Sequence, residues 1–159
     1  MALLSWGKPT IKLGLIPANG SMSDITTWID VPTPVEGSTT LNTTKGDKKE
    51  AKLEGGGYAD IKYNKNTYSL EFELYAQKGT TKPVSDSDGV IAGNYAIKLQ
   101  PEDPTVEGIV IPKCALSVED TWSAEDGGKW KYTADVLEPA SGNQILWQVV
   151  TFASSGTGD

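Results

Sequence analysis

The stretch Thr67-Tyr-Ser-Leu-Glu-Phe-Glu-Leu-Tyr-Ala-Gln77 alternates apolar with polar side chains along most of its length. Its core-facing positions are Tyr68, Leu70, Phe72, Leu74 and Ala76, and its opposite positions are Ser69, Glu71, Glu73, Tyr75 and Gln77. Alternation with period two is typical of a β-strand that lies with one face on a core and the other on water or a partner. The pattern therefore predicts a half-buried strand.

Three further segments alternate in the same way, at 95–99, 114–118 and 130–136. Ile145 to Phe152 is apolar on both faces, which is typical of a central strand or of a strand that meets another subunit. Glycine, asparagine and aspartate turn signals recur about every ten residues, and only 86–94 offers one short helical turn. We therefore expect an all-β fold, an antiparallel β-sandwich or barrel-like domain with one short helix, as a single domain over 1–159.

Residues 38–57 are polar and rich in threonine and lysine, and their only apolar side chains are Leu41, Ala51 and Leu53. They predict an extended hairpin with its turn at Lys45-Gly46-Asp47. Because so few apolar side chains cannot form a core, this hairpin is expected either to be disordered or to pair with a neighbouring molecule. Residues 1–15 are expected to form an N-terminal arm, and 153–159 a flexible tail.

All fourteen basic residues among the 159 are lysine, and the net charge is −7. The absence of histidine excludes a Ser–His–Asp triad and Cys/His zinc sites within one chain, and the absence of arginine disfavours specific DNA binding. The expectation is a protein that is not an enzyme, with no cofactor and no metal. Cys114, in an apolar stretch, is expected to be a buried apolar side chain.

Pairs of neighbouring acidic residues leave a calcium site open as an alternative to a protein without metal. Asp86-Ser-Asp88-Gly fails the EF-hand pattern, but the pairs at 102–103, 119–120 and 125–126 could join a surface calcium site.

Four of the five tryptophans divide by context. Trp130 and Trp147 lie in strand patterns and are expected in the core, whereas Trp6 and Trp122 lie outside them and are interface candidates. Exposed tryptophans could alternatively line a sugar-binding face.

The order of these segments resembles one family. A polar hairpin and a Gly-rich break precede Asn66-Thr-Tyr-Ser-Leu-Glu-Phe-Glu-Leu74. Then follow Asp88-Gly-Val-Ile-Ala-Gly-Asn-Tyr-Ala-Ile-Lys-Leu99, Pro101-Glu-Asp-Pro104, Val118-Glu-Asp-Thr-Trp-Ser-Ala-Glu-Asp-Gly-Gly-Lys-Trp-Lys-Tyr132 and Leu137-Glu-Pro-Ala-Ser-Gly142. Over about residues 5 to 152, this order resembles the major tail tube proteins of tailed phages and prophages, particularly those of Bacteroides-type gut bacteria.

The resemblance implies a β-sandwich whose copies form hexameric rings, stacked into a hollow tube for genome delivery. Its partners would be further copies of itself and other tail proteins, with DNA passing unbound and no membrane contact. The chain would be made in the host bacterial cytoplasm and end in the virion tail. The acidic balance would keep DNA from adhering to the lumen.

Under this reading the subunit contacts fall on the arm, the hairpin and one loop. They are Leu4, Trp6, Leu41, Thr43, Lys45, Asp47, Lys49, Leu53 and Trp122, while Ser69, Glu71, Glu73 and Tyr75 face the lumen or solvent. The alternatives are a β-sandwich carbohydrate-binding module, or a head-decoration or tail-terminator protein of related fold.

Overall fold

Antiparallel β-strands make up most of the chain in a computed structural model, which describes residue 4, residues 6–139 and residues 141–152. In chain order they are β1 (Thr10–Leu15), β2 (Ile29–Asp30), β3 (Thr40–Thr44), β4 (Lys48–Lys52), β5 (Tyr58–Tyr63), β6 (Thr67–Tyr75), β7 (Tyr95–Gln100), β8 (Gly108–Ser123), β9 (Gly127–Val136) and β10 (Leu146–Gln148). A 3-10 turn, η1 (Met22–Asp24), precedes β2. The all-β prediction is confirmed.

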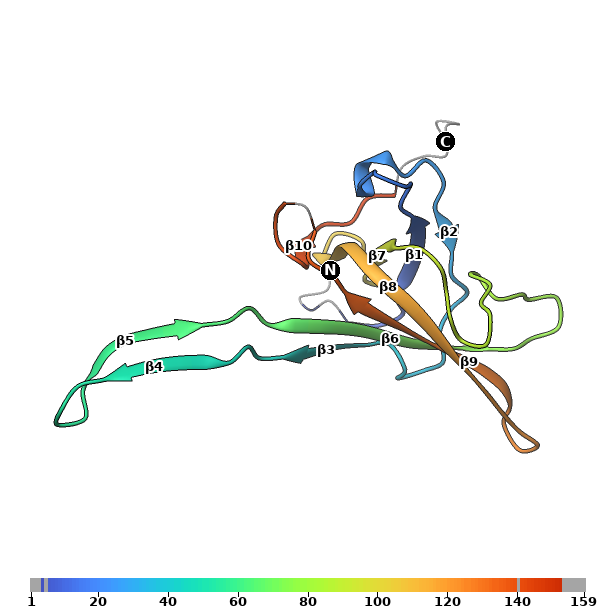
Figure 1. Ribbon diagram of the computed structural model, residues 1–159. Helices are drawn as coiled ribbons and strands as arrows, with labels where there is room; N and C mark the ends of the chain where they lie inside the picture. The colour runs from blue at the N-terminus through green and yellow to red at the C-terminus, as the bar shows by residue number, and fades with distance from the viewer. Residues whose placement is uncertain (1–3, 5, 140, 153–159) are drawn as a thin grey trace.

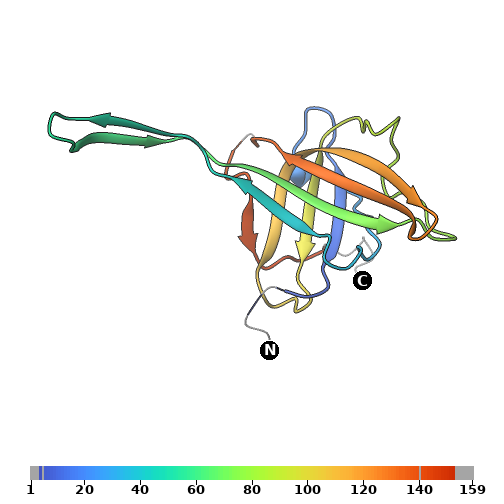
Figure 2. The ribbon, with the colours of Figure 1, turned by 90° about the horizontal axis from the view of Figure 1, so that it is seen from below.

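The main sheet follows the order β2-β1-β7-β8-β9-β6-β3, and β10 pairs with β8 beside this path. It folds over on itself, so that β1 and β7 lie in one layer and β3, β6 and β9 in the other (Figure 2). β8 belongs to both layers, because its first half pairs with β7 and its second half with β9.

A bulge marks the bend in β8. Ile111 and Cys114 oppose Ile97 and Tyr95, so β8 carries one extra residue there. Pro112 lies within this bulge, where a residue that cannot donate to the hydrogen-bond ladder is tolerated.

The core lies between the two layers. Its main side chains are Ile11, Leu13, Leu70, Phe72, Leu74, Ile97, Ile111, Cys114, Leu116, Val118, Tyr132 and Ala134. Phe72 and Tyr132 stack with their ring centroids 5.6 Å apart. The buried hydroxyl of Tyr132 donates to the carbonyl of Val84 at 2.7 Å and so ties the 76–94 loop to the sheet. The alternation in β6, β7, β8 and β9 thus predicted the core face correctly, Cys114 included.

Lysine stems and aromatic rings cover the outer face of the β1–β7 layer. Lys98 lies 4.7 Å from the centroid of the Trp28 ring, and Lys12 lies 4.6 Å from that of Phe152. The chain around 150–152 is held there, since Lys98 donates to the carbonyl of Thr151.

Two sequence predictions about local structure are wrong. Residues 10–15 do not belong to an arm, because they form β1 between β2 and β7 and bury Ile11 and Leu13. Residues 86–94 form no helix, because Asp88, Gly89 and Gly93 have φ of 50°, 90° and 86°.

The segment from Ile145 to Phe152 is not a central strand. It contributes only the short β10 at the side of β8, with Ile145 and Val150 buried. Trp147 is 56% exposed rather than in the core. The predicted flexible tail, 153–159, lies outside the described residues.

Candidate assembly surfaces

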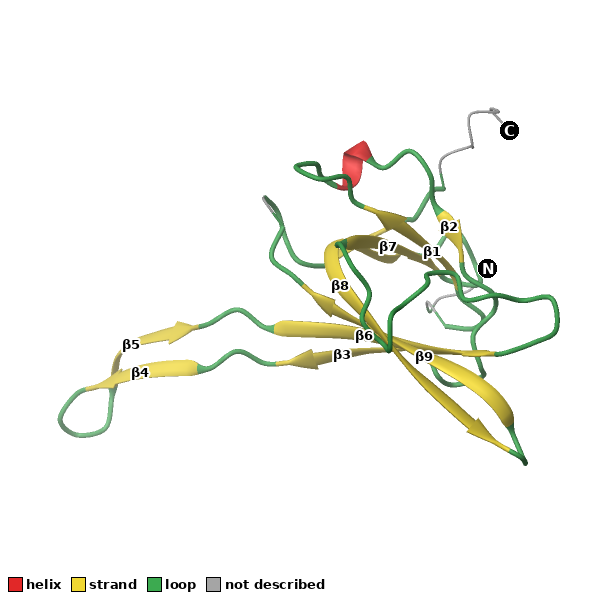
Figure 3. Cartoon of the chain, turned by 45° about the vertical axis from the view of Figure 1, so that its right-hand side comes forward, coloured by secondary structure: helices red, strands yellow, loops and turns green. Residues whose placement is uncertain are grey.

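One two-stranded extension leaves the body of the molecule. β3 and β6 pair within the main sheet, and the chain between them continues outward as the separate β4–β5 pair (Figures 1 and 3). We call residues 45–66 the distal ribbon. None of its side chains is buried, and only Gly46, Ile61 and Asn66 are half-buried.

The predicted turn at Lys45-Gly46-Asp47 is instead the joint between the sheet and the distal ribbon. The N–H of Gly46 donates to Oδ1 of Asn66 at 3.0 Å, and the N–H of Asn64 donates to the carbonyl of Asp47 at 2.8 Å. A Cβ at position 46 would lie 2.1 Å from the carbonyl oxygen of Asn64, so only glycine fits this crossing.

The hairpin reverses at Gly55-Gly56-Gly57. Gly55 and Gly56 have φ of 89° and 98°, which favour glycine, and the N–H of Leu53 donates to the carbonyl of Gly57. The predicted hairpin range of 38–57 is therefore wrong, because the chain reverses at the glycines and not at residues 45–47. As a result β3 pairs with β6, and β4 pairs with β5.

The two faces of the distal ribbon differ in character. Directly paired residues of an antiparallel ladder share a face. The aromatic face consists of Lys48, Glu50, Lys52, Tyr58, Ile61 and Tyr63, and the polar face of Lys49, Ala51, Asp60 and Lys62. Lysine ammonium groups lie over the tyrosine rings, at 5.2 Å for Lys45 on Tyr63 and 5.4 Å for Lys52 on Tyr58.

The tyrosines of this face were missed by sequence reasoning. Tyr58 is 50% exposed and Tyr63 58% exposed. The alternation in Ile61-Lys-Tyr63 is a period-two signal from which a strand after the glycines could have been predicted. That this strand pairs with residues 48–52 depends on where the chain reverses.

The predicted contact residues within 38–57 fall into different places. Leu41 is half-buried against the core, and Thr43 is exposed on β3 opposite Tyr68. Lys45 and Asp47 lie in the joint, Lys49 lies on the polar face, and Leu53 is 59% exposed at the end of the distal ribbon. Leu41 therefore belongs to the body and not to the projecting hairpin.

The predicted contact residues outside the hairpin are all exposed. Leu4 is 57%, Trp6 70% and Trp122 75% exposed. Trp6 lies beside Ile109 near the start of β8, whereas Trp122 is next to the end of the same 16-residue strand. Because the two tryptophans lie at opposite ends of β8, they cannot form one sugar-binding platform.

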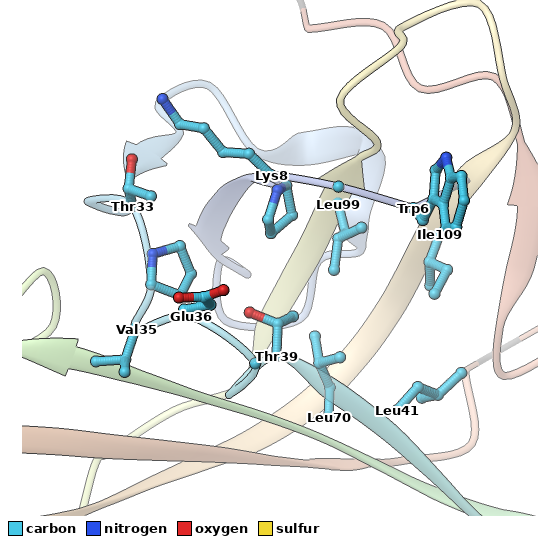
Figure 4. A pocket seen from close by; sticks show the side chains of 14 residues that line it. Trp6, Lys8, Thr33, Val35, Glu36, Thr39, Leu41, Leu70, Leu99 and Ile109 are labelled. Atoms are coloured by element: carbon cyan, nitrogen blue, oxygen red, sulfur yellow. The ribbon is translucent and has the colours of Figure 1, made fainter. Parts of the chain in front are cut away.

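A hollow of about 740 Å³ opens between the layers under Trp6 (Figure 4). Leu41, Leu70, Leu99 and Ile109 form its floor, and the 33–39 loop lines one side. Lys8 and Glu36 are its charged lining residues. The hollow can hold an apolar group, but its lining offers no thiol or imidazole for chemistry.

The outer face of the β3–β6–β9 layer is polar, as the alternation in β6 predicted. Glu71 pairs with Lys131 at 3.5 Å, and Tyr75 is 42% exposed. Glu73 is half-buried because the 35–38 loop covers the edge of β6, where the N–H of Glu73 donates to Oγ of Ser38. Ser69 pairs with Asn42 and Asp135 on the same face.

The end of β8 and the turn to β9 form the acidic end of the molecule. Glu119, Asp120, Glu125 and Asp126 lie here without any lysine in residues 119–126, all of them exposed. We call residues 119–126 the acidic tip. Lys82 contacts Asp120 at 2.9 Å, but the described residues show no ion pair for Glu125 or Asp126.

An ion-pair cluster fixes the loop beneath the acidic tip. Lys82 lies 2.7 Å from Asp86, and the N–H of Gly89 donates to Asp86 at 2.7 Å. These two hydrogen bonds lower the pKa of Asp86 below its usual value. The hydrogen bonds to Asp86 and Asp120 in turn raise the pKa of Lys82.

No protein-family model matches the chain, and no curated protein matches its sequence. The surfaces described above are therefore the basis for any functional assignment.

The described residues contain neither a metal-binding cluster nor a membrane-spanning helix. No group of three or more cysteine, aspartate or glutamate side chains is arranged to hold a metal ion. No helix in the same part of the chain is long and apolar enough to cross a lipid bilayer.

Proposed function

We propose that this chain is a self-assembling structural subunit of the tail-tube type, which forms rings that stack into a hollow tube. The observation that carries the proposal is the distal ribbon, a projecting β-hairpin without one buried side chain. An isolated two-stranded hairpin is marginally stable in water, so a long ordered one gains its stability from a partner surface. A second copy of the chain is a partner that is always present.

The exposed aromatic side chains support the same proposal. Trp6, Trp122, Tyr58 and Tyr63 are each at least half exposed, and they are spread over the ribbon, the first residues and the β8–β9 turn. Tryptophan and tyrosine are enriched among the residues that dominate binding at protein interfaces. Several separate contacts are what a subunit with more than one neighbour requires.

The outer face of the β3–β6–β9 layer, around Glu71, Glu73 and Tyr75, supports a lumen-lining role. The sheet neighbours of β6 on this face include Asp135 and Thr133 as well as Lys131. Its acidic side chains would repel the phosphates of passing DNA, which prevents adhesion during genome delivery. No catalytic step is assigned to any surface, and the apolar hollow supplies packing volume only.

The test compares the full chain with a variant in which Asn-Gly replaces residues 45–66. Thr44 and Thr67 are directly paired in the ladder, so a two-residue turn can join them. Sedimentation velocity over a concentration series, with negative-stain electron microscopy, should show rings or uniform tubes for the full chain and a monomer for the variant.

Two results would contradict the proposal. A full chain that remains monomeric at every concentration would show that it does not assemble by itself. Tubes formed by the ribbon-less variant would show that the distal ribbon is not the assembly element.

A further inference from the structure

The charge of the molecule is divided between its ends. The distal ribbon carries six lysines against four acidic residues, whereas the rest of the chain carries eight lysines against seventeen acidic residues. The distal ribbon is thus net positive, at +2, on a body of −9. The acidic tip itself holds four carboxylates and no lysine, and Lys131 and Lys129 of β9 lie opposite Glu119 and Thr121 in the ladder.

The two features project in opposite directions. In all three ribbon views the distal ribbon leaves one side of the body, and the β8–β9 turn extends from the other (Figures 1–3). They therefore cannot meet within one copy. A contact between them requires two copies arranged head to tail.

The aromatic face and the acidic tip also match in side-chain chemistry. The face presents Tyr58 and Tyr63 beside Lys48 and Lys52, and the tip presents Trp122 beside carboxylates. Aromatic side chains contribute large apolar contact area, and opposite charges around them give orientation and raise the association rate.

The backbone of the acidic tip is also available on one edge. β9 pairs with β8 from Cys114 to Ser123 on one side. On the other side, the bridge from Val90 to Ser117 and the N–H of Val118 bonded to Gly89 are the last backbone contacts among the described residues, and Lys82 contacts the side chain of Asp120 beyond them. The β8 edge beyond Val118 is an open sheet edge of the kind that pairs with another strand.

We infer that the aromatic face of the distal ribbon of one copy docks on the acidic tip of a second copy. This inference rests on the proposed function and names the partner surface that the distal ribbon contacts. Because the two surfaces differ, the contact is heterologous. Repeated head-to-tail contacts close a ring or propagate a filament, whereas a two-fold dimer would need one surface to match itself.

The test uses charge reversal on each surface of the full chain. One variant carries Lys48→Glu and Lys52→Glu, and the other carries Glu119→Lys, Glu125→Lys and Asp126→Lys. In each variant the aromatic face and the acidic tip carry charge of like sign, so assembly should need at least ~10-fold more protein. Mixed in equal amounts, the variants should assemble again, because each distal ribbon meets a tip of opposite sign on the other chain.

The matched control carries Lys49→Glu and Lys62→Glu on the polar face. It has the same net charge as the first variant but keeps the lysines of the aromatic face, so it should assemble like the unmodified chain. Circular dichroism melting of each variant checks that it is folded, which the exposure of all seven positions leads us to expect.

Trp122→Ala offers a test that does not change the charge. Loss of a central aromatic anchor should raise the assembly concentration roughly 30-fold. Assembly at the original concentration would argue against the acidic tip as the docking surface.

Failure of the docking inference is distinguishable from failure of the proposed function. If the unmodified chain assembles and both reversal variants do too, or if mixing them restores nothing, the docking is wrong and the structural role stands. If the unmodified chain stays monomeric, both are wrong. A single-stranded oligonucleotide that binds the unmodified chain but not the Lys48/Lys52 variant, with assembly unaffected, would assign the aromatic face to nucleic acid instead.

Discussion

Replacing residues 45–66 by Asn-Gly should leave the free energy of unfolding of the monomer within about 2 kcal/mol of the unmodified chain. The replaced segment contains no buried side chain, so the core is unchanged. The variant loses the ion pair from Lys65 to Glu138, whose side chains are 72% and 56% exposed. An exposed pair of this kind is worth about 0–1 kcal/mol.

Shortening the connection acts in the opposite direction. Closing a loop costs an entropy that grows with the logarithm of its length, so reducing it about tenfold gains at most about 2 kcal/mol. The two effects largely offset each other. For a chain of this size the melting temperature should therefore change by less than about 8 °C.

The assay is urea unfolding followed by tryptophan fluorescence, at a protein concentration where both chains are monomeric. The dependence of unfolding free energy on urea should also be nearly unchanged, because it scales with the surface that unfolding exposes. Phe72→Ala is the positive control. Phe72 is fully buried and stacks on Tyr132, so its truncation should cost about 3–5 kcal/mol.

A loss of more than about 3 kcal/mol in the ribbon-less variant would refute this reasoning. It would mean that the distal ribbon belongs to the cooperative folding unit, and a failure to assemble could then reflect misfolding. A small change allows the assembly experiment to be read as a test of the ribbon surface itself.

Two further predictions concern titratable groups. The lowered pKa of Asp86 comes from hydrogen bonds that favour its charged form, so its stabilisation should be complete above its unfolded-state pKa, near 4, and lost as the pH falls through the lower folded value. Asp86→Asn should thus speed proteolysis of the 76–94 loop at pH 7, and the difference from the unmodified chain should shrink as the pH falls below about 4; an effect that does not change with pH would argue against the ion pair. Burial raises the pKa of the Cys114 thiol to about 12, so at pH 8 a thiol reagent should label native protein at least ~1000-fold more slowly than protein unfolded in urea. Equal labelling rates would show that the thiol is accessible in the native state.

The sequence alone determined the strands at 67–75, 95–99, 114–118 and 130–136 and which face of each is buried. Alternation in 67–75 and 130–136 is a local property, since neighbouring side chains of a strand point to opposite faces whatever the strand pairs with. It also predicted that the hairpin region has no core and that Trp6 and Trp122 are exposed.

Only the tertiary structure decided which strands pair, because strand pairing joins residues far apart in sequence and leaves little trace in local pattern. Lys45-Gly46-Asp47 and Gly55-Gly56-Gly57 are both plausible reversals, and the choice depends on β3 pairing with β6. For the same reason the sequence places Ile11 and Leu13 in an arm, whereas the structure pairs their strand with β7. The charge division between the distal ribbon and the acidic tip is present in the composition, but their placement at opposite ends of the molecule follows from how β6, β8 and β9 cross the sheet.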